Sequence, residues 1–460
     1  MHQVADMVAD YLEQIEDYPV LPATRPGEVA ALLPTSAPEQ GEPIDAILAD
    51  FATTITPHTT HWNHPGFMAY IANTASGPGI LGETLAAALN ANAMLWRTSP
   101  VATELEERVC DWVRQLVDLP PVFRGHINDT ASIGVLLALA AARDRAAPDV
   151  RSVGLSGEHL VVYTSDQAHS SVDKAAITLG LGLDQVRRIP SDGSFRMDVE
   201  ALADTVRREA SRGVTPIAIV ATAGTTSTGS LDPLEGVAAV AREHGAWFHV
   251  DAAYGGGAAV LPEVRAKFAG IEHADSIVIN PHKWLFTPVD CSILYLRDPA
   301  ALKAAFALVP AYLKTTDPGV TNLMDFGPQL GRRFRALKLW MVLRSFGAEG
   351  LRSRIGEHLR LAKQLADAVD ADPAFARVAP VELGIVAFRC LSGGSPEDDD
   401  ALAMRVIAEV NARGDVFLSH SVLGGRTVLR VVVGNIRTTE RHVTAAWDQI
   451  RSIAAALRAP

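Results

Sequence analysis

The sequence predicts an α/β fold with a mainly parallel sheet that helices cover on both faces. Short apolar, β-rich runs alternate with helical stretches from residue 77 to residue 344, an alternation typical of parallel sheets. The runs are continuously apolar, as expected of strands that are buried on both faces. A chain of 460 residues, 48% hydrophobic and 20% charged, is long enough to bury such a core. The β-rich runs lie at residues 160–163, 217–220, 247–250 and 276–279, and helical stretches separate them at 199–212 and 234–244.

Two segments flank this large domain of residues 77–344. Residues 1–76 predict a helix, a proline-punctuated arm at 18–34 and a second helix. The arm can pack against little of residues 1–76, so we expect it to lie on the surface of a partner subunit. Residues 345–460 mix a long helix with shorter strands and predict a small α+β domain. The expected elements there are helices at 350–369, 401–412 and 442–457 and strands near 385–389 and 428–433.

Charge and cysteine content argue against several functions. The 41 basic and 53 acidic residues give a net charge of −12 without a basic stripe, which argues against a nucleic-acid partner. Cys110, Cys291 and Cys390 lie too far apart for a disulfide framework or a thiolate zinc site. No apolar run reaches membrane-spanning length, and residues 1–16 lack the basic and apolar regions of a signal peptide. We therefore expect a cytoplasmic protein with no membrane partner.

Polar residues follow the four β-rich runs, at the strand ends where parallel sheets bind their ligands. In chain order they are His169, Thr226, Asp251 and Lys283, one after each run. Taken singly, each has an ordinary structural explanation, such as an N-cap, a solvated lysine or a hydrogen-bonding histidine. Four of them at successive strand ends favour a site at one edge of the sheet.

One chemistry uses a lysine, an aspartate and a flat side chain together. A lysine in a partly apolar setting, here Pro281, Trp284 and Phe286, has a lowered pKa and can form a Schiff base with an aldehyde. An aspartate opposite a pyridine nitrogen keeps that nitrogen protonated, so that the ring accepts electrons. Residues 129–132 open a predicted helix at 133–143, and a helix N-terminus with small hydroxyl residues suits a phosphate. The same residues would also serve as a plain helix cap with no ligand.

The lysine segment resembles that of the group II pyridoxal-phosphate amino-acid decarboxylases, and most closely the aromatic-L-amino-acid decarboxylases. Its residues are Asn280-Pro281-His282-Lys283-Trp284. Five other segments resemble the family in the same order, and together they span nearly the whole chain. They are residues 61–65, 99–106, 168–171, 249–254 and 330–335.

This resemblance implies a type I pyridoxal-phosphate fold, like that of aspartate aminotransferase, with a seven-stranded sheet. It also implies an obligate homodimer with active sites at the interface. Pyridoxal 5′-phosphate would be bound covalently by Lys283, pair through its ring nitrogen with Asp251 and stack against His169. Thr226 would lie near the ring hydroxyl or the substrate carboxylate. The other cofactor-binding residues that the family implies are Thr130, Ala131, Ser132, Ala253, Asn280 and His282.

The implied reaction is decarboxylation of an L-amino acid to the amine and CO₂. Tyr312 opens a polar stretch that resembles the start of the family's mobile catalytic loop, although a plain surface loop would have a similar composition. Tyr312, alone or with His169, would return a proton to Cα. Related aldehyde synthases carry Phe or Asn at these two positions, so this pair favours amine formation over oxidative deamination.

The sequence departs from the family at two places. Asp129 stands where a glycine commonly precedes the phosphate-binding hydroxyls, and its carboxylate would repel a phosphate unless it points away or caps the helix. The expected substrate pocket is also less aromatic than usual. It comprises Trp62, Tyr70, Ile71, Asn73, Asn92, Met94 and Gly331. Gly331 leaves room for a large ring, which favours Trp, Tyr, Phe, DOPA or 5-hydroxytryptophan, while a medium apolar substrate such as Met or Leu stays open.

Other functions find less support. His58, His61 and His64 are spaced by three, but no carboxylate or cysteine accompanies them, so a zinc site is disfavoured. Residues 255–257 are glycines without the spacing of a dinucleotide-binding loop. A cofactor-binding scaffold that has lost catalysis is disfavoured because the chain keeps all four expected catalytic residues, Lys283, Asp251, His169 and Tyr312.

Overall fold

A computed structural model describes residues 1–155, 159–308 and 319–458. The chain forms two compact units. One contains Met1–Ala72, Lys363–Val378 and Val386–Pro460, and the other contains Asn73–Ala362 and Ala379–Ile385. The N-terminal segment therefore shares a unit with the C-terminal strands and helices. Across the described residues, no helix is both long and apolar enough to cross a membrane.

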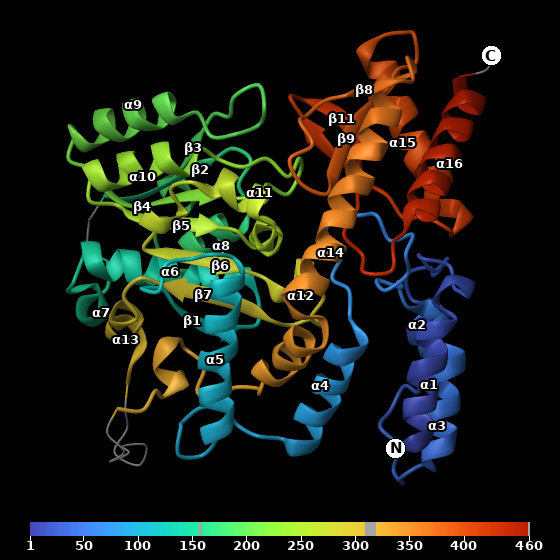
Figure 1. Ribbon diagram of the computed structural model, residues 1–460, viewed down its shortest axis with the longest axis horizontal. Helices are drawn as coiled ribbons and strands as arrows, with labels where there is room; N and C mark the ends of the chain where they lie inside the picture. The colour runs from blue at the N-terminus through green and yellow to red at the C-terminus, as the bar shows by residue number, and fades with distance from the viewer. Residues whose placement is uncertain (156–158, 309–318, 459–460) are drawn as a thin grey trace. The chain divides into compact units, whose positions relative to one another are not determined.

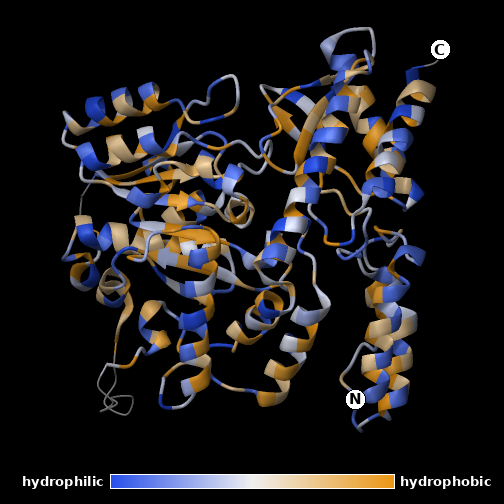
Figure 2. Ribbon diagram, viewed as in Figure 1, coloured by the Kyte–Doolittle hydropathy of each residue, from blue (hydrophilic) through white to orange (hydrophobic). Residues whose placement is uncertain are grey.

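The larger unit is built on a seven-stranded, mainly parallel sheet, which confirms the predicted fold class (Figure 1). Its order is β1-β7-β6-β5-β4-β2-β3, and only β7 runs antiparallel to its two neighbours. Figure 2 shows hydrophobic residues in the central strands, and every residue of strands β5, β6 and β7 is buried. The strands are β1 (Arg124–Asn128), β2 (Leu160–Ser165), β3 (Val186–Ile189), β4 (Thr215–Thr222), β5 (Trp247–Asp251), β6 (Ser276–Ile279) and β7 (Ser292–Leu296).

Helices cover the sheet, with α9 and α10 on one side and α6 and α7 on the other (Figure 1). The small residues of α6 let it lie close to the strands, since a Cβ on Gly134 would come within 2.9 Å of Val278. Because α6 starts directly after β1, its N-terminus lies at the carboxyl edge of the sheet. The helices of this unit are α4 (Gly77–Leu89), α5 (Pro100–Leu116), α6 (Ala131–Ala146), α7 (Val150–Val153), α8 (Ser171–Thr178), α9 (Val199–Ala210), α10 (Leu234–Glu243), α11 (Pro262–Arg265), α12 (Pro281–Trp284) and α13 (Ala300–Phe306).

The smaller unit contains the antiparallel sheet β10-β11-β9-β8, in agreement with the expected α+β composition. The proline-punctuated arm is anchored within this unit at its start: Val20 is fully buried, and its N–H donates to the Gly414 carbonyl at 2.7 Å. Most residues from 23 to 50 are exposed. The elements are α1 (His2–Glu13), α2 (Glu28–Leu32), α3 (Ile44–Asp50), β8 (Phe375–Arg377), β9 (Ile385–Cys390), α15 (Pro396–Arg413), β10 (Ser419–Leu423), β11 (Arg426–Val432) and α16 (Glu440–Arg458).

One helix is longer than expected. The structure extends α14 over Ala336–Asp370, whereas the sequence predicts a helix only over 350–369. Gly347, with φ of 62° and ψ of 179°, interrupts the helical backbone, so α14 consists of two helices in succession. The predicted helix corresponds to the second of them.

A buried ion pair lies where four segments of the larger unit meet. Arg332 Nη2 donates to Glu106 Oε1 at 3.0 Å, and the side chains are 3% and 1% exposed. Glu106 Oε1 also accepts the backbone N–H of Ile127 in β1 at 2.9 Å, while Arg332 Nη2 donates to the Ile127 carbonyl. On the other side, the Arg332 N–H donates to Asn92 Oδ1 at 2.9 Å, and the Arg332 carbonyl accepts from Ala93 at 2.8 Å. The pair thus ties α5, β1 and the 92–93 turn to the 331–333 segment.

Replacing Glu106 with glutamine should lower the free energy of unfolding near pH 7 by about 3–5 kcal/mol, because it leaves the Arg332 guanidinium buried without a counter-charge. Burial alone would raise the pKa of Glu106, but the Arg332 charge and the hydrogen bonds lower it to about 2 from 4.5. A depressed carboxyl pKa stabilises the fold fully above the unfolded-state pKa, and this contribution disappears as the pH falls towards 2. The difference between the wild type and Glu106→Gln in urea unfolding should therefore shrink below about pH 4.5.

Glu107→Gln is the matched control, because Glu107 lies next on the same helix and is exposed. Its effect should stay below about 1 kcal/mol. Equal destabilisation by the two variants, or a Glu106→Gln effect that does not depend on pH, would contradict the role of this ion pair.

Candidate active site

The predicted site residues lie at one edge of the large sheet. Asp251 is the last residue of β5, Lys283 lies in α12 directly after β6, and His169 and Thr226 follow β2 and β4. These four strands are neighbours in the order β6-β5-β4-β2 and run parallel, so their carboxyl ends meet at the same edge.

One carboxylate oxygen of Asp251 accepts a hydrogen bond and the other does not. Its Oδ1 accepts the Ala253 N–H at 3.0 Å, and the register places Thr222 of β4 and Val278 of β6 beside it. Its Oδ2 accepts no hydrogen bond from any residue that the structure describes. The Ala253 carbonyl in turn accepts the Asn280 N–H at 3.3 Å, which links the end of β5 to the lysine-bearing turn. A buried carboxylate with a free oxygen suits a cationic ring N–H.

The Lys283 amine has no partner of its own among the described residues: no hydrogen bond or ion pair ends on its Nζ. Burial lowers the pKa of Lys283 below its ordinary value, and the Asp251 carboxylate opposes this shift. A larger fraction of the amine is therefore neutral at pH 7–8 than for an exposed lysine. A neutral, unpaired amine is the form that condenses with an aldehyde.

Buried hydrogen bonds fix the turn that carries Lys283. His282 Nδ1 accepts the Cys291 N–H at 2.9 Å, and the Asn280 Nδ2 lies 3.2 Å from His282 Nε2. Asn280 Oδ1 accepts the Ser292 hydroxyl at 2.7 Å. Burial, together with the Lys283 charge, lowers the pKa of His282 to about 3, so the ring is neutral. Asn280 and His282 thus lock the lysine-bearing turn against β7.

His169 presents a neutral ring next to this charge pair. Its Nδ1 accepts the Ser171 N–H at 3.1 Å, which leaves the ring proton on Nε2. Partial burial lowers the pKa of His169; Asp251 opposes this shift and Lys283 adds to it. His169 is exposed, so its ring is available to cover a ligand.

The turn after β4 presents Thr226 at the same edge. A chain of buried hydroxyls braces this turn, with Thr225 Oγ1 at 2.8 Å from Thr228 Oγ1 and Thr228 Oγ1 at 2.7 Å from Ser230 Oγ. Thr226 itself is exposed. The backbone of this turn is therefore held rigidly beneath an accessible hydroxyl side chain.

The N-terminus of α6 offers donors for an anion. Thr130 is the N-cap, but its side chain accepts no hydrogen bond from the first turn, so the N–H groups of that turn remain available, with the hydroxyl of Ser132 nearby. The Asp129 carboxylate bonds to the next residue, the N-cap Thr130, and not to the first turn of α6: its Oδ1 accepts the Thr130 N–H at 2.6 Å and the Thr130 hydroxyl at 3.3 Å. Asp129 therefore does not cap the helix interior, and Ala131 and Ser132 keep their backbone donors.

The expected substrate-pocket residues fall into two groups, one in each unit. In the larger unit, Asn92 Nδ2 lies 3.6 Å from Met94 Sδ, and a Cβ on Gly331 would come 3.8 Å from Asn92 Nδ2. Asn73 belongs to this unit and keeps a buried amide oxygen without a hydrogen bond. In the smaller unit, the Trp62 and Tyr70 rings stack with centroids 6.1 Å apart, and Ile71 follows. Tyr312 lies outside the described residues.

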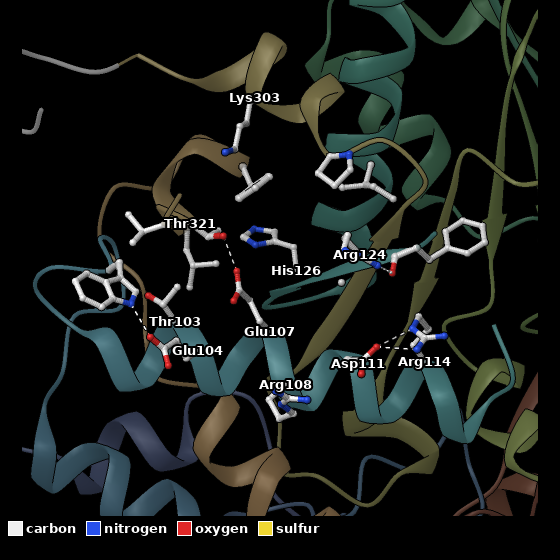
Figure 3. A pocket seen from close by; sticks show the side chains of 18 of the residues that line it. Thr103, Glu104, Glu107, Arg108, Asp111, Arg114, Arg124, His126, Lys303 and Thr321 are labelled. Carbon is white, nitrogen blue, oxygen red and sulfur yellow. Dashed lines mark hydrogen bonds and ion pairs between the residues drawn. The ribbon is translucent and has the colours of Figure 1, made fainter. Parts of the chain in front are cut away.

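A cavity of about 920 Å³ lies away from this edge. It is lined by the exposed face of α5, by Arg124 and His126 in the first half of β1, and by α13 (Figure 3). Glu107 points towards Thr321, and Asp111 pairs with Arg114 at 2.8 Å. The cavity lies beside the amino-terminal half of β1, whereas the candidate site gathers at the carboxyl ends. Glu104 accepts the Trp96 indole N–H at 2.8 Å, so several of the cavity's carboxylates already have partners within the cavity wall. The convergence of polar residues at the sheet edge therefore guides the choice of the candidate site, rather than cavity size.

Sequence analysis gave no role to Glu106 and Arg332, which position the Asn92 turn and β1. The available signal is the buried stripe of α5, whose members recur at helical spacing. They are Ala102, Thr103, Glu106, Val109, Cys110 and Val113. A carboxylate in an apolar stripe requires a buried cation, and Arg332 supplies it.

Comparison with known proteins agrees with this geometry. The model of the pyridoxal-dependent decarboxylase conserved domain matches residues 26–391. A phenylacetaldehyde synthase of Arabidopsis thaliana is 41% identical over 99% of this chain and 95% of its own length. Tryptophan decarboxylase 2 of Oryza sativa subsp. japonica is 41% identical over 98% and 93% of the two chains. The crystal structure of Oryza sativa TDC with PLP and tryptamine superposes with a TM-score of 0.97 at 36% identity, covering 100% of this chain and 97% of that one. The chain belongs to the pyridoxal-phosphate-dependent decarboxylase family.

Proposed function

We propose that this enzyme decarboxylates an aromatic L-amino acid to the corresponding amine and CO₂. The observation that carries the proposal is the unpaired Lys283 amine, which shares one sheet edge with the free oxygen of Asp251 and the neutral ring of His169. Each of these groups matches one part of pyridoxal phosphate: the aldehyde carbon, the ring nitrogen and the ring face.

When bound, pyridoxal phosphate supplies an aldehyde carbon and a ring that accepts the electron pair released as CO₂ leaves. Lys283 would hold the aldehyde carbon through its amine, and Asp251 would keep a proton on the ring nitrogen. The His169 ring would cover one face of the cofactor. Thr130, Ala131 and Ser132 would hold the phosphate at the α6 N-terminus, with Thr226 beside the ring. Ala253 would hold the Asp251 carboxylate in place, and Asn280 and His282 would hold the turn that carries Lys283.

The choice between amine and aldehyde as product depends on how quickly Cα is protonated. Relatives of both kinds exist, since a tryptophan decarboxylase and a phenylacetaldehyde synthase are similarly close to this chain. We propose that Tyr312 delivers the proton to Cα and that His169, with its proton on Nε2, supports this step. Rapid protonation leaves little time for oxygen to react, so the chain would release amine.

An aromatic substrate fits the residues of the expected pocket. Trp62 and Tyr70 provide flat apolar surfaces, while Gly331 leaves the space beside Asn92 unfilled. In the larger unit, Asn92 and Met94 are more polar and more flexible than aromatic side chains would be. These features favour a large ring that carries a polar group, such as an indole or a phenol.

The proposal predicts that the enzyme loaded with pyridoxal phosphate releases CO₂ and amine in equal amounts from at least one of Trp, Tyr, Phe, DOPA and 5-hydroxytryptophan. Rates with Met and Leu should be lower. Mass spectrometry and CO₂ capture under air measure both products. Tyr312→Phe should shift the product from amine towards aldehyde and hydrogen peroxide, because it lacks the acidic proton of the phenol.

Tyr163→Phe is a suitable control, since Tyr163 is a buried strand residue whose hydroxyl bonds to Glu209 at 2.8 Å. It should leave the amine-to-aldehyde ratio unchanged. Aldehyde as the main product of the wild type would replace the proposal with an aldehyde synthase. Amine as the only product of Tyr312→Phe would remove Tyr312 from the proton-transfer step.

We further propose that the enzyme is a homodimer with shared active sites, and the N-terminal segment supports this. Its helices α1 and α3 expose apolar side chains; Val4 of α1 is 40% and Ile44 of α3 is 63% exposed. Val4, Val8 and Phe51 line a mostly apolar groove of about 540 Å³ between α1 and residues 48–61. A second copy of the chain would cover this groove.

Light scattering should give a particle of twice the chain mass of 49.1 kDa. Val8→Glu places a charge in the groove and should dissociate the dimer and abolish most activity. Ala9→Glu adds the same charge one position on, outside the groove, and should leave the dimer intact. An active monomer of the wild type, or equal effects of the two variants, would contradict this interface.

We also propose a reducing compartment such as the cytoplasm. Cys110, Cys291 and Cys390 are free and buried, and burial raises the pKa of each thiol. Thiols in this state serve as packing groups and need no oxidising environment.

A further inference from the structure

The direction of the Lys283 side chain has to be set by the residues around it, because no hydrogen bond from a described residue ends on its Nζ. Lys283 lies in α12, a single helical turn of four residues that is too short to be rigid by itself. Successive residues of a helix project about 100° apart, so His282 and Trp284 point to different sides with residue 283 between them. The hydrogen bond of His282 to the Cys291 N–H fixes one of these sides.

Trp284 fixes the other side through a buried hydrogen bond. The side chain is 1% exposed, and its Nε1–H donates to His358 Nδ1 at 3.0 Å. An indole N–H can only donate, so a buried tryptophan needs such an acceptor. His358 is also buried and belongs to the second helix of α14. Its ring meets Phe286 edge-on as well, with centroids 5.8 Å apart. His358 thus contacts two residues of the segment that follows Lys283.

The Trp284 ring also connects the lysine turn to the aspartate turn. Tyr254 follows Asp251 by three residues and stacks on the indole, with ring centroids 4.7 Å apart and planes inclined by 15°. The Tyr254 hydroxyl accepts the Gly384 N–H at 3.1 Å, which holds the phenol ring in turn. A Cβ on Gly257 would come 3.1 Å from Trp284 Cβ, so the tryptophan side chain is closely packed. The indole therefore joins the turns of both candidate catalytic residues.

We propose that His358 is a positioning residue for Lys283 and that it acts through Trp284. With His282 held on one side and Trp284 on the other, the single turn of α12 cannot rotate about its axis. This fixes the direction in which the Lys283 amine projects, while the stack on the indole keeps the lysine turn beside the turn of Asp251. A reacting group that is held in place needs no further ordering before it reacts. The inference rests on the proposed role of Lys283 in holding the cofactor aldehyde.

The test follows the cofactor's placement and the chemical step separately. His358→Leu keeps an apolar side chain but leaves the Trp284 N–H without its acceptor. Its kcat should fall by about ten- to a hundredfold, because a displacement of about 1 Å slows a reaction by this order, with little change in KM. The visible circular dichroism of bound pyridoxal phosphate should weaken too, since it depends on a fixed orientation of the cofactor. His358→Asn, whose Oδ1 can replace Nδ1 as acceptor, should restore most of both signals.

Trp284→Phe examines the same hydrogen bond from the donor side. It removes the indole N–H, keeps an aromatic ring for Tyr254, and should cause the same two losses. It also serves if leucine at position 358 prevents folding. If both residues act through one hydrogen bond, the double variant Trp284→Phe/His358→Leu should be no slower than the slower single variant. A double variant whose loss of kcat equals the product of the two single losses would overturn the proposal.

Tyr295→Phe controls for a general loss of stability. It removes another buried hydrogen bond of the same unit, from the Tyr295 hydroxyl to the Cys110 carbonyl at 2.8 Å. Tyr295 lies opposite Ile277, near the amino end of β6, whereas the lysine turn follows the carboxyl end. The variant should lower Tm much as His358→Leu does and leave kcat and the dichroism unchanged. Equal losses of kcat in both variants, or a His358→Leu variant with lowered Tm but wild-type kcat and dichroism, would reduce His358 to a packing residue.

Lys283→Arg distinguishes a failure of this inference from a failure of the proposed function. Borohydride should fix no cofactor to the chain of this variant. If that holds while His358→Leu keeps the kcat and the dichroism of the wild type, only the role of His358 is overturned. If borohydride still fixes a stoichiometric amount of cofactor to Lys283→Arg, the proposed role of Lys283 is overturned, and the positioning role of His358 with it.

Discussion

The buried ion pair between Glu106 and Arg332 is the interaction on which the rest of the larger unit depends. It holds the start of the Arg332 segment, the Asn92 turn and strand β1 to helix α5. Strand β1 leads directly into α6, so the same pair fixes where the helix N-terminus that we propose for phosphate binding begins. The turn at residues 92–93 carries Asn92, one of the residues of the proposed substrate pocket. A single desolvated pair therefore positions residues proposed for cofactor binding and residues proposed for substrate binding.

The direction of the strands converts this scaffold into a chemical site. Parallel strands bring the lysine turn, Asp251 and the turns of His169 and Thr226 to one edge, although these residues are far apart in sequence. Each reactive group is then fixed by a neighbour rather than by another reactive group: Asp251 by Ala253, the lysine turn by Asn280 and His282, and His169 by Ser171. This division leaves Lys283 Nζ and one Asp251 oxygen available to a ligand.

Most of the central strands and the positions of the polar residues that follow them could be predicted from the sequence. The strands β2, β4, β5 and β6 are continuous apolar runs followed by polar residues, so these strands and the edge at which the polar residues meet could be predicted. Strands β1 and β3 were not predicted, because they lie at the sheet edges and carry charged residues such as Arg124 and Arg187. Strand β7 was not among the predicted runs either, although all its residues are buried. The reversed direction of β7 depends on its pairing with β1 and β6. Glu106 and Arg332 are distant in sequence, so the buried stripe of α5 could indicate a buried carboxylate but not the cation that pairs with it.

If the cofactor binds at the sheet edge with Lys283 and Asp251, borohydride reduction of the enzyme loaded with pyridoxal phosphate will fix it to Lys283, and mass spectrometry of a digest will locate the modified lysine. We expect one phosphopyridoxyl group per chain, on Lys283, and none after Lys283→Arg. Stoichiometric modification of any other lysine, with Lys283 unmodified, would contradict it.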